Sequence, residues 1–265
     1  MEVFGRDWIL GTFKASNYGL YLASFNYNGD AEEELGFKLS TMEEFVGNNP
    51  IPIYIGDKHE EKLRPQITLC KNPCKYHGKE MNFSQKDCRE ILRLLTGIKG
   101  YQWMKLDTLE DTEDVWFRAK ITNVSYKRVG GNVVGLIFQL ECDSCYGYST
   151  ENIVEISAKT NKPFYFFNNT DDLNNYVLPI VEITPTSNTD IIITNTSDNN
   201  WVTEIKNAKA NETIIINSQT EIISSDLNNF NLHFPRIIPE TNKYVLSVDA
   251  KIVFKFRAYR KVGFN

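Results

Sequence analysis

The sequence has no long apolar run and no excess of basic residues. No stretch reaches the roughly 18 apolar residues that a membrane-spanning helix needs, so we expect no membrane protein. The sequence contains 29 Lys and Arg residues and 34 Asp and Glu residues, which gives a formal net charge of −5. Nucleic-acid binders that act through a basic face are therefore excluded as a class.

We expect no export signal at the start of the sequence. Residues 1–11 (MEVFGRDWILG) lack a basic head followed by an apolar stretch of about 7–15 residues. We therefore expect the five cysteines to be reduced thiols in a cytoplasm.

The common catalytic signatures are absent as well. The sequence contains no HExxH, GxSxG, GxGxxG or GxxxxGK[ST] pattern, so zinc proteases, serine hydrolases, dinucleotide-binding enzymes and P-loop enzymes lack their motifs. We predict a protein that is not an enzyme and binds no cofactor. A hydrolase with paired carboxylates stays open as an alternative, because strands can bring any two Asp or Glu residues together.

Asparagine is abundant and unevenly distributed. Residues 1–150 contain 9 asparagines, and the shorter remainder contains 18, whereas all five cysteines and all four methionines precede the division. A chain of 265 residues suffices for one large or two modest domains. We predict a first domain over 1–150 and a second over 160–265, joined by Tyr148–Pro163. Asparagine tolerates the left-handed backbone of turns, so its excess indicates many turns in the second domain.

The first domain is predicted to be β-rich with one helix, Ser84–Thr96. The Ser84 hydroxyl can accept a hydrogen bond from a free backbone N–H, and Asp87 follows near the positive end of the helix dipole. Gly97 fits a left-handed residue just past the helix end. One apolar stripe recurs at helical spacing: Cys88, Ile91, Leu92 and Leu95.

A long hairpin is predicted after the helix. Its first arm alternates from Val115 to Ile121, a turn forms at Gly130–Asn132, and the return arm places alternate residues from Val134 to Cys142 on one face. The acidic stretch Asp107–Asp114 is expected to be a solvated loop.

The second domain is predicted to consist almost entirely of short strands separated by polar turns, as in a sandwich or barrel. The predicted strands are Val177–Ile183, Asp190–Thr194, Trp201–Ile205, Thr213–Ile216, Glu221–Ser224 and Phe230–Phe234. A final run from Tyr244 to Ala258 alternates strictly between apolar and other residues. Such a run exceeds the usual strand of about 5–6 residues, so it serves two sheets or passes back to the first domain.

A cluster of cysteines and a histidine raises the possibility of a metal site. Cys70, Cys74 and His77 are closely spaced, and Cys88 follows on the helix. Tetrahedral zinc would need four such ligands to converge. The alternative is that Cys88, on the apolar stripe of the helix, acts as a small hydrophobic residue. We predict no metal.

Trp201 is the candidate for sugar binding. Together with Tyr176 and Phe230 it could form an aromatic platform on which a sugar ring stacks. Aromatic residues of a small sandwich more often belong to its core. The sequence leaves both interpretations open.

Several stretches, in order along nearly the whole chain, resemble the distal tail protein (Dit) family of long-tailed bacteriophages. No single motif is diagnostic, and the order of the pieces carries the resemblance. The stretches are GRDWILGTFKASNYGLYLASFN at the start, Asn49–Pro65, Phe83–Gly97, Gly100–Leu106, Cys142–Tyr148, Tyr176–Pro185, Trp201–Asn217, Glu221–Ser224, Phe234–Arg236 and Arg257–Phe264.

The resemblance implies a ring-forming first domain that assembles as a homohexamer and a second domain that is a galectin-like β-sandwich. The final strand, about 244–264, would return to the first domain. The ring would join the tail tube to the tail tip, contact the tape-measure protein and the tail-associated lysin, and anchor receptor-binding proteins. DNA would pass through its lumen without specific binding. The protein would be assembled in the cytoplasm of a bacterial host and reside at the virion tail tip.

Two other functions compete with a structural hub. One is a carbohydrate-binding module or host-surface adhesin with Trp201 in its platform. The other is a hydrolase that acts on cell-wall sugars, for which no motif is present.

Overall fold

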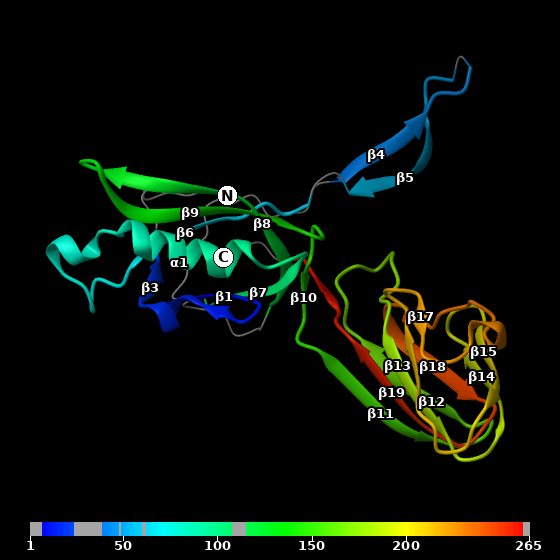
Figure 1. Cartoon of the computed structure of the whole chain (residues 1–265). Helices are drawn as coiled ribbons and strands as arrows, with labels where there is room; N and C mark the ends of the chain where they lie inside the picture. Colours follow the sequence, from blue (N-terminus) through cyan, green and yellow to red (C-terminus); the bar gives the residue numbers. More distant parts are fainter. Residues whose placement is uncertain (1–6, 24–38, 48, 60–61, 108–114, 262–265) are drawn as a thin grey trace. The chain divides into compact units, whose positions relative to one another are not determined.

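The chain forms two units, each with its own sheets and core. The computed structural model describes residues 7–23, 39–47, 49–59, 62–107 and 115–261. The first unit comprises residues 1–147 and 261–265, and the second comprises residues 148–260 (Figure 1). None of the helices within the described residues is long and apolar enough to cross a bilayer.

An antiparallel seven-stranded sheet, ordered β2-β1-β7-β8-β9-β6-β3, is the centre of the first unit. A separate two-stranded sheet pairs β4 with β5. The strands of this unit are β1 (Asp7–Leu10), β2 (Phe13–Lys14), β3 (Leu20–Leu22), β4 (Leu39–Glu44), β5 (Ile53–His59), β6 (Gln66–Lys71), β7 (Gln102–Asp107), β8 (Phe117–Val129) and β9 (Asn132–Cys142). Two short 3-10 helices, η1 (Ala15–Tyr18) and η2 (Gly78–Met81), lie between strands.

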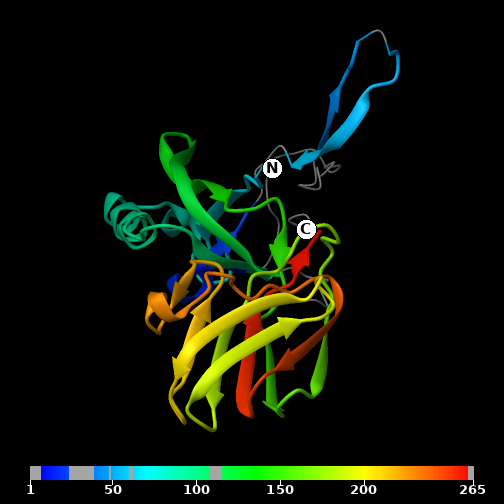
Figure 2. The same cartoon turned by 90° about the vertical axis from the view of Figure 1, so that its right-hand side faces the viewer.

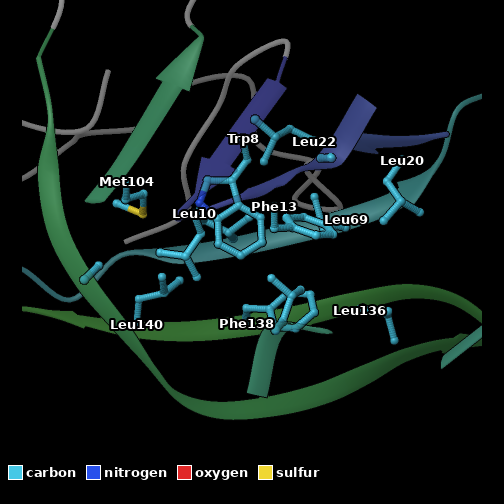
Figure 3. Close-up of a cluster of buried hydrophobic side chains, with 14 of the residues drawn as sticks. Trp8, Leu10, Phe13, Leu20, Leu22, Leu69, Met104, Leu136, Phe138 and Leu140 are labelled. Carbon is cyan, nitrogen blue, oxygen red and sulfur yellow. The ribbon is translucent and has the colours of Figure 1, made fainter. Parts of the chain in front are cut away.

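The core of the first unit gathers side chains from strands that are distant in sequence (Figure 3). Trp8 is completely buried, and its indole packs against Phe13 and Phe138 with ring centroids 5.7 Å apart in each pair. Burying an aromatic side chain of this size stabilises the fold by several kcal/mol, of which about 0.5–1.5 comes from each favourable ring pair. Strand β1 is thereby held to β9, although the two are not neighbours in the sheet.

Helix α1 (Gln85–Thr96) packs on this core through Cys88, Ile91 and Leu95, so the predicted stripe is confirmed. Ser84 is its N-cap: the Asp87 backbone N–H donates to Ser84 Oγ over 3.1 Å, and the Ser84 N–H donates to the Asp87 carboxylate. The expectation for Gly97 is wrong, because its φ of −76° is right-handed. A Cβ at this position would lie 2.9 Å from the Arg93 carbonyl oxygen, so close packing on the helix end explains the glycine.

The β8–β9 hairpin is present and longer in its first arm than predicted. Strand β8 begins at Phe117 instead of Val115 and continues to Val129. Gly130 and Gly131 form the turn with φ of 55° and 84°, values that cost glycine little. Leu136, Phe138, Leu140 and Cys142 are buried, as the alternation predicted. Of the predicted acidic loop Asp107–Asp114, only Asp107 lies within the described residues, as the last residue of β7.

The second unit is a β-sandwich. A five-stranded sheet, ordered β11-β19-β13-β16-β17, stacks on a four-stranded sheet, ordered β12-β18-β14-β15 (Figures 1 and 2). Its elements are β11 (Asn152–Ala158), β12 (Pro163–Asn168), β13 (Ile180–Pro185), β14 (Thr189–Asn195), β15 (Trp201–Ala208), β16 (Ile214–Asn217), β17 (Ile222–Ile223), η3 (Leu227–Asn229), β18 (Glu240–Leu246) and β19 (Ala250–Phe256). A further short sheet pairs β10 (Gly147–Tyr148) with β20 (Tyr259–Arg260).

Aromatic side chains join the two sheets. Phe166 of β12 lies 5.6 Å from Tyr244 of β18 and 5.0 Å from Phe254 of β19, measured between ring centroids. Tyr244 and Phe254 are almost completely buried. The Tyr244 hydroxyl donates to the Arg236 carbonyl oxygen over 2.8 Å, which satisfies the polar end of a buried ring.

The final alternating run is two strands and not one. Strand β18 ends at Leu246, a turn follows at residues 247–249, and β19 begins at Ala250 in the opposite sheet. The alternation itself is preserved, because the eight alternate residues from Tyr244 to Ala258 are all buried. Because the alternation of buried and other residues continues through the turn, the sequence pattern does not reveal the turn and suggested a single strand. The expectation that the run serves two sheets is confirmed.

Two other segments differ from expectation. Tyr148–Pro163, predicted as a connection, contains strand β11 and the start of β12. Phe230–Phe234, predicted as a strand, makes only a single bridge, between Phe230 and Ile205. The fold is otherwise mainly β with one α-helix, as the sequence predicted.

Candidate interaction surfaces

The four residues considered as an alternative metal site, Cys70, Cys74, His77 and Cys88, do not converge. Cys88 is buried in the core under α1, Cys70 is half-buried on β6, and Cys74 and His77 are exposed in the segment after β6. Burial raises the pKa of the Cys70 and Cys88 thiols, which disfavours the thiolate that zinc binds. In the part of the chain that the structure describes, no three His, Cys, Asp or Glu side chains are grouped to hold a metal ion.

Trp201 begins β15 and its ring already has partners within the chain. Its Nε1 donates to the Phe234 carbonyl oxygen over 3.0 Å. The His233 ring stacks on it with centroids 4.8 Å apart, and the Arg236 guanidinium carbon lies 3.7 Å from the indole centroid. Of the other two platform candidates, Phe230 is buried, whereas the exposed Tyr176 contacts the same Arg236 guanidinium as Trp201. The sugar platform therefore stays a prediction, with Trp201 engaged by neighbouring side chains.

Arg236 is the centre of this cluster, and the sequence did not single it out as functional. Its guanidinium carbon lies 4.0 Å from the Tyr176 ring centroid, so the cation contacts both Tyr176 and Trp201. Two of its nitrogens donate to the carboxylate of buried Asp198, and this hydrogen bonding raises the Arg236 pKa. The Arg236 guanidinium thus makes cation–π contacts with two rings and a charge-assisted hydrogen-bonded pair with Asp198. Because these partners all belong to the chain itself, the cluster has a structural role.

The most apolar exposed surface in the first unit is the ribbon of β4, β5 and their connection. We call it the β4–β5 hairpin, residues 39–59. Its exposed apolar side chains lie on both strands and the turn: Met42, Phe45, Val46, Ile51, Ile53, Tyr54 and Ile55. Each of Phe45, Ile51 and Ile55 is 60% exposed or more. Exposed apolar groups gathered in this way are typical of protein–protein contact sites.

The sequence of β5 carries a signal for this surface. Ile53, Tyr54 and Ile55 follow one another without a polar alternate. Successive residues of a strand point to opposite faces, so this run makes both faces of the hairpin apolar. In the described part of the chain, these three side chains are exposed on the ribbon.

Solved structures with the same fold extend over nearly the full chain. The Dit protein of phage SPP1, described as a paradigm of the hub adsorption apparatus in phages that infect Gram-positive bacteria, is 9% identical with a TM-score of 0.65, covering 95% of this chain and 98% of that chain. A chain of the phage P2 baseplate, in its activated conformation with calcium, is 10% identical with a TM-score of 0.58, covering 98% of this chain and 100% of that chain. The strontium form of that baseplate gives 11% identity with the same TM-score and coverage.

Family comparisons divide the chain as the two units do. Residues 4–144 match the family described as a phage tail protein N-terminal domain, and residues 146–256 match the one described as a phage tail C-terminal domain. No curated protein matches the sequence. The resemblance to the distal tail protein family is confirmed by these matches together with the fold. The chain belongs to the family of phage tail proteins that these two domain models describe.

Proposed function

We propose that this protein is a structural hub of the phage tail tip, without catalytic activity. It assembles as a homohexameric ring that joins the tail tube to the baseplate and anchors tail-associated and receptor-binding proteins. One observation carries the proposal: the fold matches the SPP1 hub protein over 95% of this chain and 98% of that one, so both domains correspond in order.

Each domain has its own part in this proposal. Residues 1–150 form the ring, and residues 160–265 form a galectin-like sandwich. The chain returns to the first domain only after Arg260, because β18 and β19 belong to the sandwich and the second unit extends to residue 260. Pairing of β20 with β10 supports the return, because it brings the end of the chain back beside the start of the second unit.

Charge and strand edges are consistent with a ring. Six copies with a net charge of −5 give an acidic assembly, and phosphates bind mainly to Lys and Arg, so DNA passes the lumen without adhering. A closed ring with head-to-tail contacts also covers strand edges that would otherwise pair without limit. The tail tube protein, the tape-measure protein and the tail-associated lysin are the proposed neighbours.

Electron microscopy and light scattering of the purified protein test the proposal together. We expect a six-fold ring with a central hole and a mass six times that of the 30.6 kDa chain. A chain that stays monomeric at high concentration, both alone and mixed with the tail tube and tape-measure proteins, would contradict the hub function.

A further inference from the structure

Strand β12 of the second unit carries aromatic side chains on both faces. Phe164 and Phe166 pack on the core of the sandwich and stack on Tyr244 with interplanar angles of 12° and 8°. Tyr165 and Phe167 lie on the opposite face and are 57% and 62% exposed. The core therefore explains Phe164 and Phe166 but gives no reason for an exposed tyrosine and phenylalanine on the same strand.

The outer edge of β12 is open. In the described part of the chain β12 pairs with β18 alone, and its main chain makes no hydrogen bond outside that ladder. In an antiparallel pair every second residue turns its N–H and C=O groups away from the partner strand. The six residues of β12 span roughly 20 Å. An edge of this length is a template for the addition of a further strand.

The other described edges of the sandwich carry protection that β12 lacks. The outer edge of β15 is covered, because the Asn231 N–H donates to the Glu204 carbonyl oxygen over 3.2 Å. Strand β17 has only two residues. Strand β11 carries the exposed and charged Glu155. Strand β12 has no charged residue, and Pro163 protects only its first position. An exposed, uncharged aromatic edge of this kind favours aggregation unless a partner covers it.

Two lysines beside β12 indicate the chemistry of the partner. Lys243 lies opposite Tyr165 on β18, with its Nζ 5.8 Å from the Tyr165 ring centroid. Lys162 is exposed and immediately precedes β12. Within the described residues neither lysine has an ion-pair partner, and the acidic residue of β18, Glu240, lies at the far end of the ladder. A strand with acidic residues would complement this charge.

We propose that the outer edge of β12 accepts an extended segment of another tail protein, which joins the four-stranded sheet as an additional strand. Alternate apolar residues of this segment cover Tyr165 and Phe167, and acidic residues beside them meet Lys162 and Lys243. Main-chain hydrogen bonds provide the affinity and the side chains provide the selectivity. The choice of a tail protein as the partner rests on the proposed function, whereas the acceptor site rests on β12 itself.

A second copy of the chain fits this edge less well. If β12 paired with β12 of another copy, the added strand would be uncharged, and its immediate neighbours in the sequence are Lys162 and Asn169. Such a strand brings no carboxylate to the two lysines. It would also place a two-fold contact on a protein whose proposed ring needs head-to-tail contacts.

A synthetic strand tests the site without the natural partner. The probe is the peptide Glu-Thr-Bpa-Thr-Val-Thr-Glu, where Bpa is the photoreactive p-benzoylphenylalanine. It is irradiated with the full chain, and the crosslinks are mapped by mass spectrometry. We expect crosslinks at β12. A peptide with Lys in place of both Glu should give a yield lower by roughly tenfold, because it opposes like charges.

Backbone methylation distinguishes strand addition from a simple apolar contact. One control peptide is N-methylated at its threonines, and another at Bpa and Val. In an added strand only one of these two sets of N–H groups faces the sheet. One control should therefore lose crosslinking by roughly tenfold through its missing hydrogen bonds, and the other should keep it. Equal yields from all three peptides would mean that no strand is added.

Matched variants of the chain locate the site. F167K places a charge on the edge and should lower crosslinking by roughly tenfold. I222K alters a residue that is also 62% exposed, on β17, and should leave crosslinking unchanged. K162E/K243E should prefer the lysine peptide to the glutamate peptide. Circular dichroism confirms that each variant is folded.

The outcomes separate the acceptor site from the hub function. Crosslinks confined to other regions, or none, overturn the acceptor site. A mass that falls by half in F167K, measured by light scattering, assigns the edge to a second copy and also overturns it. Six-fold rings without crosslinks at β12 leave the hub function standing. Crosslinks at β12 of a chain that never assembles support the acceptor site and contradict the hub.

Discussion

Asparagine residues provide many of the tight turns of the second unit. Eight non-glycine residues in the described part of the chain have positive φ, and five of them are asparagine: Asn161, Asn199, Asn200, Asn207 and Asn211. All five lie in the second unit, where the sequence showed the excess. Asparagine adopts this backbone more readily than other side chains because its amide can hydrogen-bond locally. Composition alone therefore located the turn-rich half of the protein.

Asp249 fixes the turn between β18 and β19, and its titration gives a prediction. The Thr160 backbone N–H donates to it over 2.7 Å and Lys159 Nζ over 2.9 Å, which together with the Thr160 hydroxyl lowers its pKa to about 2. In the unfolded protein the pKa of Asp249 is about 4. Because the pKa is lower in the folded protein, the ionised carboxylate stabilises the fold at pH values above about 4, and this stabilisation is lost as the pH falls through 2. We expect D249N to lower the urea midpoint at pH 7, and the difference from wild type to shrink between about pH 4 and pH 2.

The exposed Glu212 provides the control for Asp249. E212Q removes a carboxylate that has only a distant lysine partner, 3.9 Å away. Its midpoint should stay near that of wild type over the same pH range. A difference for D249N that is constant with pH would mean that the carboxylate charge does not hold the turn.

At the level of elements, the helix was the most predictable part of the fold. Its N-cap, its first-turn acid and its apolar stripe are local signals, and the structure has all three. The end of the helix was mispredicted because Gly97 is set by contact with the Arg93 carbonyl and not by a left-handed turn. Similarly, the break at residues 247–249 depends on partners elsewhere: the Ser247 N–H donates to Ile192, and the Thr186 N–H donates to Asp249.

The helix cap gives a second prediction. S84A should destabilise the protein by about 1 kcal/mol, because the Asp87 N–H loses its acceptor at the helix start. The matched variant S84D keeps an acceptor in place and should stay close to wild type. Urea unfolding followed by tryptophan fluorescence measures both variants. Equal losses for the two substitutions would show that the cap hydrogen bond is not what Ser84 contributes.

At the scale of the whole molecule, the acidic net charge of the sequence is the property that bears on the proposed function. The chain has a net charge of −5 and a sequence pI of about 5.4. We expect the assembled protein not to retard duplex DNA in a mobility-shift assay at about 0.15 M salt, because an acidic surface releases no counterions from phosphates. Retardation at micromolar protein, strengthening as salt is lowered, would contradict a lumen that lets DNA pass freely.

The sequence by itself determined the mainly β class, the single helix, the buried faces of the β8–β9 hairpin and the final run, and the turn-rich second half. These follow from periodicity and residue chemistry, which act over a few neighbours. Only the tertiary structure decided which strands pair, that Trp201 is held by Arg236 and Asp198, and that, among the described strands, β4 and β5 form a separate two-stranded sheet. These features depend on contacts between residues tens of positions apart in the sequence. A local sequence pattern does not specify which distant segment a residue will contact.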